Sequence, residues 1–462
     1  MFDRNIYISR RQLLKDKVNE GIILLLSNDE SPMNYAGNPY LFRQDSTFLY
    51  YIGLDEPDIY SIIDLDEYRE ILFADDATID DIIWMGPQPR KEDKAHKTGI
   101  AHVESVKELK AYLHKAINNG RNIHYLPPYR PEHTIKLSKW LQKDLQNVHD
   151  GSSLELIKAV IEQRSFKTEE EVSEIETAHN VTYDMHTTAM KMAKSGMLER
   201  EISGTIEGIA LSGGRSASFS TILSIHGETL HNPHHGNVMQ NGDILINDSG
   251  AESGLHYAAD ITRTFPVSGK FTEQQKSIYD IVLKTQLTAI EAVKPGIRYI
   301  DVHKLAARTI GDGLKLLGLM KGDISEAVEL GAHALFFPHG LGHMLGLDVH
   351  DMENLGEDLV GYDDTIKRSS QFGLAYLRFA KELKRGYVLT VEPGIYFIPE
   401  LIDLWKSEKK FNSFINYEKV EKYKKFGGIR IEDDVLVTEK GHRVLGKNIP
   451  KAVTDVEEMC RQ

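Results

Sequence analysis

Residues 338–351 read PHGLGHMLGLDVHD and place three histidines and two aspartates among glycine, leucine, methionine and valine. Imidazole and carboxylate groups are costly to bury among apolar side chains unless a partner or a cation holds them. The glycines do not form a dinucleotide-binding loop, because their spacing is G-x-G-x-x-x-G and no strand-to-helix context supports it. The stretch therefore predicts that His339, His343 and His350 meet polar or ionic partners from elsewhere in the chain.

Length and composition bound the class of protein. A chain of 462 residues exceeds what one core usually supports, so we expect two domains. The apolar content of 41% and the charged content of 27% are typical of a soluble globular protein. The net charge of −14 argues against nucleic acid or an anionic membrane as a partner.

Cysteine usage and the N-terminus indicate a compartment. The single cysteine, Cys460, excludes an intramolecular disulfide and fits a reducing environment. The first residues, MFDRNIYISRRQ, lack the apolar core of a signal peptide, and the run GIILLL is far too short to span a membrane. We therefore expect a cytoplasmic protein.

Residues 1–165 predict a small α/β domain. Short apolar runs typical of strands occupy residues 21–27, 47–54, 60–65 and 70–74, and the amphipathic stretch 104–117 predicts a helix.

Residues 166–462 predict a larger α+β domain with mostly antiparallel strands. Thr168 and Glu171 form a capping-box pattern at the start of a long helix. Further helices are expected over about 272–294 and 300–318, and an insertion at 400–428 is expected to be partly helical. The predicted strands cover residues 218–225, 242–248, 259–265, 387–392 and 428–438.

Four acidic residues lie within or at the ends of these apolar strands. Asp248 closes one strand, Asp260 begins the next, Glu392 ends a third and Glu432 lies within a fourth. Each has an ordinary explanation when taken alone, since a strand-end Asp usually forms a turn and Glu432 could pair with Arg430. Taken with a histidine they supply a mixed set rich in oxygen donors. Such a set suits two manganese, cobalt or zinc ions better than one tetrahedral structural zinc.

Several motifs resemble one known family. HGLGHMLGLDVHD, LTVEPGIYF, GGIRIEDDVLVT and DITRTFPVSGKFT are similar to the pita-bread metallopeptidases, and more narrowly to their Xaa-Pro branch of aminopeptidase P and prolidase. FRQDSTFLYYIGLDEPD (42–58) resembles the N-terminal domain of the same branch. The resemblance implies an aminopeptidase P-like domain over 1–165 and a pita-bread catalytic domain over 166–462.

The same resemblance assigns site residues. It implies Asp248, Asp260, His343, Glu392 and Glu432 as ligands of two divalent metal ions, with Asp260 and Glu432 bridging them. It implies catalytic roles for Glu392, His350 and His231. The substrate-binding residues that it implies are His231, His339, His350, Tyr396 and Arg430.

Two departures from the family pattern bear on these expectations. Asp260 follows Asp248 by 12 residues, one more than is usual, and we expect the hairpin to absorb the extra residue near 254–256. The intervals of 49 residues from His343 to Glu392 and 40 from Glu392 to Glu432 are closer to those of prolidase.

Inserts beside the cleft are able to close the space beyond proline. The basic residues there that could pair with the carboxylate of a terminal proline are Lys367, Arg368, Arg378, Lys381, Lys384, Arg385, Lys422, Lys424 and Lys425.

The sequence thus predicts a two-metal exopeptidase that cleaves before proline, an Xaa-Pro aminopeptidase, with prolidase as the alternative. Manganese is the expected metal, with cobalt or zinc possible. Peptides with proline in the second position are the expected partners, and a homodimer or homotetramer is implied, with N-terminal domains contributing to a neighbour's cleft. Two relatives of the fold, a non-catalytic binding module and a metal-free enzyme that hydrolyses creatine, lack the ligand set found here.

Overall fold

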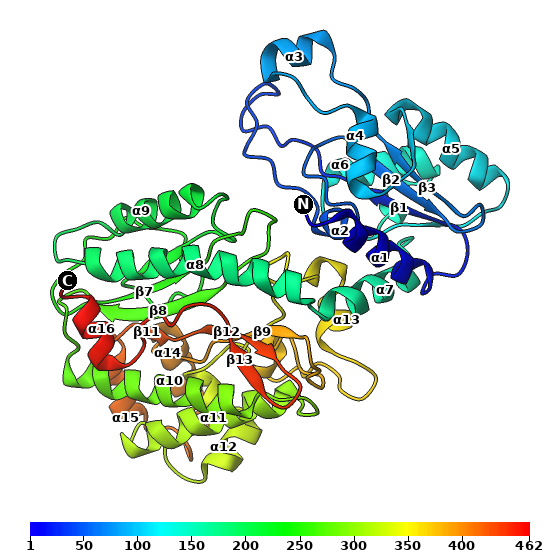
Figure 1. The fold of residues 1–462 in the computed structure, drawn as a ribbon. Coiled ribbons are helices and arrows are strands. Elements are labelled where there is room, and N and C mark those ends of the chain that lie inside the picture. The colour runs from blue at the N-terminus through cyan, green and yellow to red at the C-terminus, as the bar shows by residue number, and fades with distance from the viewer. The chain divides into compact units, whose positions relative to one another are not determined.

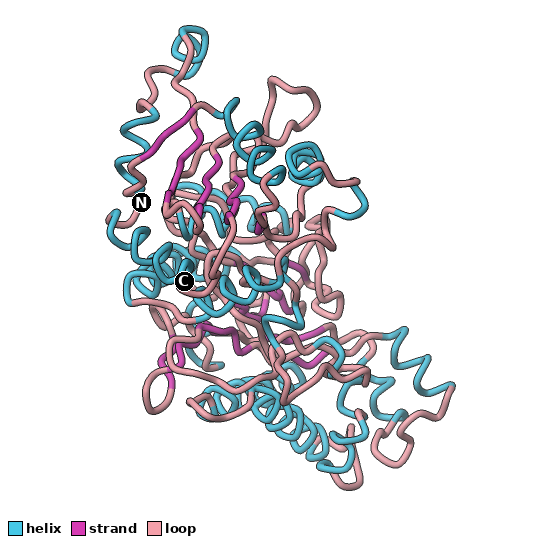
Figure 2. The backbone as a smooth tube through the Cα atoms, turned by 90° about the vertical axis from the view of Figure 1, so that its right-hand side faces the viewer, coloured by secondary structure: helices cyan, strands magenta, loops and turns pink.

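In a computed structural model that describes residues 1–462, the chain divides into two units. The N-terminal unit comprises residues 1–164 and 354–356, and the C-terminal unit comprises residues 165–353 and 357–462. Figure 1 labels most of their helices and strands, and Figure 2 shows where loops separate them. No helix is both long enough and apolar enough to span a membrane.

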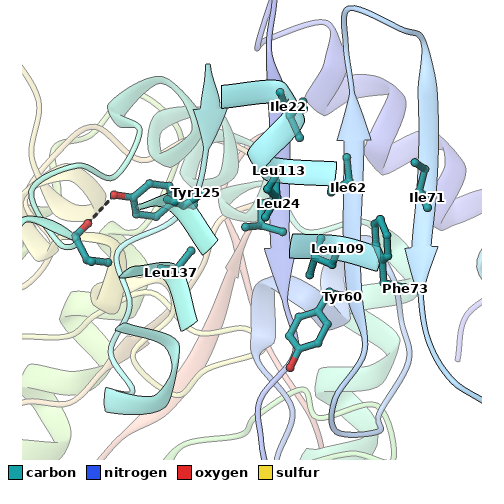
Figure 3. Packing of buried hydrophobic residues seen from close by; sticks show 13 residues of the cluster. Ile22, Leu24, Tyr60, Ile62, Ile71, Phe73, Leu109, Leu113, Tyr125 and Leu137 are labelled. Carbon is teal, nitrogen blue, oxygen red and sulfur yellow. Dashed lines mark hydrogen bonds between the residues drawn. The ribbon is translucent and has the colours of Figure 1, made fainter. Parts of the chain in front are cut away.

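A mixed five-stranded sheet forms the centre of the N-terminal unit. Its strand order is β4-β3-β2-β1-β5, from β1 (Ile22–Leu26), β2 (Tyr60–Asp64), β3 (Arg69–Phe73), β4 (His102–Glu104) and β5 (Ile123–His124). Helices α5 (Val106–Asn118) and α6 (Pro131–Leu141) contribute Leu109, Leu113 and Leu137 to the core shared with this sheet (Figure 3). The predicted strands at 21–27, 60–65 and 70–74 and the predicted helix are confirmed.

The predicted strand at 47–54 is wrong. Ser46–Tyr51 instead forms helix α2, and the Asp45 side chain accepts a hydrogen bond from the Phe48 N–H at its start. This cap satisfies a backbone donor that a strand would have paired with a neighbour, and the helix is buried on all sides. The unit also contains α1 (Arg4–Lys15), α3 (Ile79–Met85), α4 (Lys91–Thr98) and most of α7 (Leu154–Ser165).

Two pairs of helices pack against the sheets of the C-terminal unit. Helix α8 (Glu169–Met192) packs on β7 and β8, and α9 (Glu199–Ser212) packs on β6; α10 (Glu273–Ala292) contacts β9, β10 and β11 and pairs with α11 (Tyr299–Leu316). The capping box of Thr168 and Glu171 is present at the start of α8, as predicted. The helices predicted over 272–294 and 300–318 are α10 and α11.

The strands of this unit pair antiparallel, as predicted. One sheet has the order β6-β7-β8, from β6 (Ile222–Ser224), β7 (Ile244–Ser249) and β8 (Ile261–Pro266). A second sheet has the order β13-β12-β9, from β9 (Val388–Val391), β12 (Asp433–Val437) and β13 (His442–Val444). A third sheet pairs β10 (Gly394–Tyr396) with β11 (Gly428–Arg430). The segment 428–438, predicted as one strand, is therefore two strands that belong to different sheets.

Four of the remaining α-helices lie in connections, and α16 (Val453–Met459) follows the last strand. The four are α12 (Ile324–Leu330), α13 (Glu357–Gly361), α14 (Pro399–Ser407) and α15 (Tyr417–Val420). Helices α14 and α15 confirm that the insertion at 400–428 is partly helical.

Candidate active site

Two glutamates lie where the C-terminal strands are interrupted. The pair β9–β12 and the pair β10–β11 share one antiparallel register, so Glu392 stands opposite Glu432 in the gap between them. Across this gap the Ile431 N–H donates to the Pro393 carbonyl at 3.4 Å. Like charges directly opposite each other on paired strands repel unless a proton or a cation lies between them.

Asp248 and Asp260 belong to the hairpin of β7 and β8. Asp248 pairs with Thr262, and the register continues unbroken to a turn at residues 254–256. Asp260 is therefore the diagonal neighbour of Asp248 on the same face of the hairpin. The turn takes up the extra residue of the interval, with His256 in the left-handed region at a φ of 69°. The predicted accommodation at 254–256 is confirmed, with the strand register intact on both sides.

His343 reaches the site from a segment that runs beside β9. The Thr390 N–H donates to the His343 carbonyl at 3.0 Å, and Gly342 lies so close to this strand that a Cβ atom there would be 2.1 Å from the Thr390 oxygen. The Nδ1 atom of His343 lies 3.0 Å from the Met344 carbonyl oxygen, which only accepts hydrogen bonds. Nδ1 therefore carries the proton, and the Nε2 lone pair is left for a cation.

These segments bring the side chains together. Asp260, His343 and Glu432 each offer a ligand atom within 4.8 Å of the others. The Nε2 atom of His343 lies 3.4 Å from Asp260 Oδ2 and 3.8 Å from Glu392 Oε1. Because the Glu432 N–H donates to the Thr262 carbonyl at 3.0 Å, β8 adjoins the second interrupted strand. The predicted ligands thus occupy adjoining strand segments.

The charges in this cluster call for a cation. Burial raises the pKa of Asp260 well above its ordinary value, and the Asp248 carboxylate raises it further. The pKa of Glu432 is also raised well above its ordinary value, first by burial and then by the Asp260 carboxylate. Burial raises the pKa of Glu392 as well. One oxygen each of Asp248 and Asp260 is buried without a hydrogen-bond partner. A divalent cation would satisfy these oxygens and favour the ionised carboxylates, so the residues fit a metal centre.

Arg430 organises one side of the cluster. Its Nη2 donates to Asp248 Oδ2 at 2.6 Å, its Nη1 to the Tyr396 hydroxyl at 2.8 Å, and its Nε to Thr262 Oγ1 at 3.1 Å. The Thr262 hydroxyl in turn donates to Glu432 Oε2 at 2.6 Å. The simple pairing of Arg430 with Glu432 is therefore not formed. Arg430 restrains Asp248 directly and Glu432 through Thr262.

Tyr396 lies behind the cleft rather than on its wall. Its side chain is fully buried, and its hydroxyl is 2.9 Å from Nε2 of His339. His339 Nδ1 lies 2.7 Å from the Gly340 carbonyl and so donates there, which leaves Nε2 to accept from the tyrosine. Burial, assisted by Arg430, lowers the pKa of His339 to about 3 and keeps the ring neutral. The expectation of a substrate-contacting Tyr396 is corrected to a residue that positions His339 and Arg430.

The cluster opens into a cleft of about 630 Å³, within the range of pockets that bind small ligands. The imidazole of His350 faces that of His343 with ring centroids 4.1 Å apart. Burial and then His343 lower the pKa of His350, and burial and then Arg430 lower that of His231. Nine of the ten predicted site residues line the cleft, namely His231, Asp248, Asp260, His339, His343, His350, Glu392, Arg430 and Glu432.

Two residues that hydrogen-bond to the predicted site residues escaped sequence reasoning. Thr262 links Arg430 to Glu432, and the Asp434 carboxylate accepts a hydrogen bond from the Asp260 N–H at 2.9 Å. Both stand two residues after a predicted ligand, so strand alternation could have found them. Arg378 lines the cleft, but nothing in its sequence context distinguishes it from the other basic residues of the insert.

Comparison with known proteins identifies the family. The sequence model described as metallopeptidase family M24 matches residues 173–439, more than half of the chain. The chain belongs to metallopeptidase family M24. The model described as the aminopeptidase P N-terminal domain matches residues 7–124 of this M24 protein.

Relatives with two different names resemble this M24 peptidase along most of its length. It is 34% identical to Xaa-Pro dipeptidase of Homo sapiens over 451 residues, which cover 95% of this chain and 89% of the relative. It is 30% identical to Xaa-Pro aminopeptidase of Escherichia coli over 467 residues, which cover 99% and 97%.

Solved structures resemble the fold of this M24 peptidase. Aminopeptidase P from E. coli with the inhibitor Pro-Leu superposes with a TM-score of 0.82 at 30% identity, covering 99% of this chain and 98% of that one. The M24 peptidase therefore has the pita-bread fold, preceded by an aminopeptidase P-type N-terminal domain.

Proposed function

We propose that this protein is a two-metal exopeptidase that hydrolyses the bond between an N-terminal residue and a following proline. The observation that carries the proposal is the convergence of two aspartates, two glutamates and one histidine on one cleft in an M24 peptidase. Relatives along most of its length are named Xaa-Pro aminopeptidase and Xaa-Pro dipeptidase.

Two divalent ions are the proposed cofactors, held by Asp248, Asp260, His343, Glu392 and Glu432. Asp260 and Glu432 are the proposed bridging ligands. Both are held close to His343, and their pKa values are raised by burial and by neighbouring carboxylates. Oxygen donors outnumber nitrogen in the set, which favours manganese, with cobalt or zinc as alternatives. When bound, such ions polarise the scissile carbonyl and make a water molecule more acidic.

The protein's own groups manage protons and orientation. The Glu392 carboxylate reaches the cleft with 19% of its side chain exposed, where it takes a proton from the attacking water and passes it to the proline nitrogen that leaves. His350 faces His343 with ring centroids 4.1 Å apart, and burial lowers its pKa, so that its ring is neutral at neutral pH and donates to the oxygen on which negative charge develops. His231 holds the amide side of the substrate.

Removal and return of metal test the cofactor proposal. Exhaustive chelation should abolish peptidase activity, and manganese or cobalt should restore it with about two ions per chain. Metal content and activity are measured on the same samples. Full activity in metal-free protein would contradict the proposal.

We favour an aminopeptidase, with a cleft that is open beyond proline, over a prolidase. Of the nine basic residues considered for proline's carboxylate, only Arg378 lines the cleft, and its guanidinium already contacts Glu353 at 2.5 Å and Glu357 at 3.2 Å. A cation engaged by two carboxylates offers little net charge to a third. A dipeptide-specific site therefore requires Arg378 to leave one of these partners.

Matched substrates separate the two activities. We expect release of Ala from Ala-Pro-Ala at least as fast as from Ala-Pro, with Ala-Ala-Ala as the negative control. Cleavage of Ala-Pro alone, lost when proline's carboxylate is amidated and in Arg378→Gln, would make the protein a prolidase.

A homodimer or homotetramer is also proposed, through the N-terminal unit. Helix α3 has no buried residue, although five of its seven positions are apolar. Trp84 is 83% exposed. Exposed apolar side chains gathered on one short helix are typical of a surface that a partner covers.

A further inference from the structure

One wall of the cleft is apolar and lies outside the polar cluster. Phe372 and Tyr376 reach the cleft from the segment that contains a short 3-10 helix, η4 (Leu374–Tyr376), and Ile398 and Leu401 reach it from the start of α14. The metal ligands, the catalytic histidines and Arg430 come from other segments. The four side chains of this apolar wall therefore have no part in the reaction proposed above.

Contacts behind the wall hold the two segments together. The ring of Phe372 packs edge-on against Trp405 of α14 with centroids 5.8 Å apart, and against Tyr376 at 6.1 Å. Trp405 is buried and is supported by Phe411 at 5.5 Å. Yet Phe372 stays 36% exposed and Tyr376 58% exposed. Large apolar surface fixed from behind and open to a cleft is typical of a ligand-binding subsite.

The position of Arg378 beside the apolar wall indicates which part of a bound peptide would contact that wall. Tyr376 and Arg378 are two residues apart on one segment, and both line the cleft. Arg378 is the one of the nine basic insert residues that lines the cleft, so it is the one that a carboxylate beyond proline would meet if Glu353 or Glu357 released it. The segment therefore faces the part of the substrate that follows the scissile bond.

We infer that Phe372, Tyr376, Ile398 and Leu401 form a subsite for an apolar side chain on the residue that follows proline. The inference rests on the proposed function and names its substrate class: peptides of at least three residues with an aliphatic or aromatic third residue. No charged side chain belongs to the wall and the nearby charge on the same segment is the cationic Arg378, so a basic third residue would lose its hydration there without a partner.

Two peptide series test the inference. The ratio of kcat/KM for Ala-Pro-Leu to that for Ala-Pro-Ala should be about tenfold, the lower end of what added methylenes contribute in an apolar pocket. Leu-Pro-Ala against Ala-Pro-Ala reports on the N-terminal residue instead. Phe372→Ala and Leu401→Ser should bring the first ratio close to one, whereas Phe372→Leu should keep most of it.

Helix α14 offers a matched control. Leu404 is 52% exposed and does not line the cleft, so Leu404→Ala should leave the ratio unchanged. Thermal unfolding of each variant would check that the fold is retained.

The outcomes separate the two proposals. Equal rates on Ala-Pro-Leu and Ala-Pro-Ala, a preference confined to Leu-Pro-Ala, or cleavage of Ala-Pro alone would each overturn the subsite while leaving hydrolysis before proline intact. Failure to cleave any proline peptide with metal bound would overturn the proposed function, and the subsite with it.

Discussion

Single carboxylates set how the metal-free protein responds to pH. The pKa of Asp260 and that of Glu432 are raised in the folded chain, by burial first, so the folded state holds protons that the unfolded state releases above about pH 4. The stability that these protons contribute is present at low pH and is lost as pH rises through the folded values. We therefore expect the free energy of unfolding of chelated protein to fall between pH 4 and neutrality.

Asp260→Asn separates this effect from catalysis. The variant removes one of the repelling charges, so the chelated variant should be more stable than chelated wild type at pH 7, although it binds less metal and loses at least about a hundredfold in rate. Denaturant unfolding at several pH values measures the first effect. A variant less stable than wild type when both are metal-free would contradict the account of Asp260.

His350 should matter to the reaction and not to metal retention. It lines the cleft beside His343 but is not among the clustered ligand atoms. His350→Ala should therefore retain both ions and lower kcat by about 10²–10³-fold with a smaller change in KM, as removal of a transition-state donor does. Loss of metal from this variant would show that His350 is a ligand.

At the scale of elements, a buried ion pair ties the histidine-rich stretch to the start of α8. Lys167 Nζ lies 2.9 Å from Asp351 Oδ2, and each side chain is 1% exposed. Lys167→Met leaves a buried carboxylate without this cation and should cost about 3–5 kcal/mol of unfolding free energy. The double variant Lys167→Met/Asp351→Leu should recover most of that loss.

A surface pair supplies the comparison. Lys304 and Glu329 lie 2.7 Å apart, but Glu329 is 55% exposed. Lys304→Met should change the free energy of unfolding by less than about 1 kcal/mol. Equal effects of the two lysine substitutions would contradict the importance assigned to burial.

Sequence periodicity predicted the elements whose local and tertiary preferences agree. The long helices α8, α10 and α11 and most strands are confirmed because one apolar period runs through each. Residues 47–54 failed because a continuous apolar run does not distinguish a buried strand from a buried helix, and the cap at Asp45 decides between them. The break at Glu432 was also missed, since the apolar alternation runs through it while the hydrogen-bonding partners change.

The candidate site was predictable in its residues and not in its supports. Motifs single out Asp248 and Glu432, but only the folded chain shows that Arg430 reaches one directly and the other through Thr262. Tyr396 belongs to a recognisable motif, yet its side chain is fully buried and its hydroxyl bonds to Arg430 and His339 instead of lining the cleft. The contacts of Arg430 with Asp248 and Thr262, and of Thr262 with Glu432, join residues more than a hundred positions apart, which no local pattern encodes.

At the scale of the whole molecule, self-association should depend on α3. Ile83 is 68% exposed and Trp84 83% exposed. The double variant Ile83→Asp/Trp84→Asp should shift the protein to monomers in sedimentation velocity without lowering its unfolding temperature, because neither side chain belongs to the core. Leu145→Asp, at a position 56% exposed in the same unit, should leave the mass unchanged. A wild-type monomer at micromolar concentration would contradict the proposal.

The shared register across the interrupted strands also bears on how the chain avoids misfolded forms. A slip of one residue between β9–β10 and β11–β12 would send Glu432 to the opposite face from Glu392 while preserving many backbone hydrogen bonds. A cation binds only the alignment in which both face it, and so lowers the free energy of that alignment alone. Metal that is present during synthesis would then favour the native strand register. Chains made without metal would include a larger share of slipped, inactive forms.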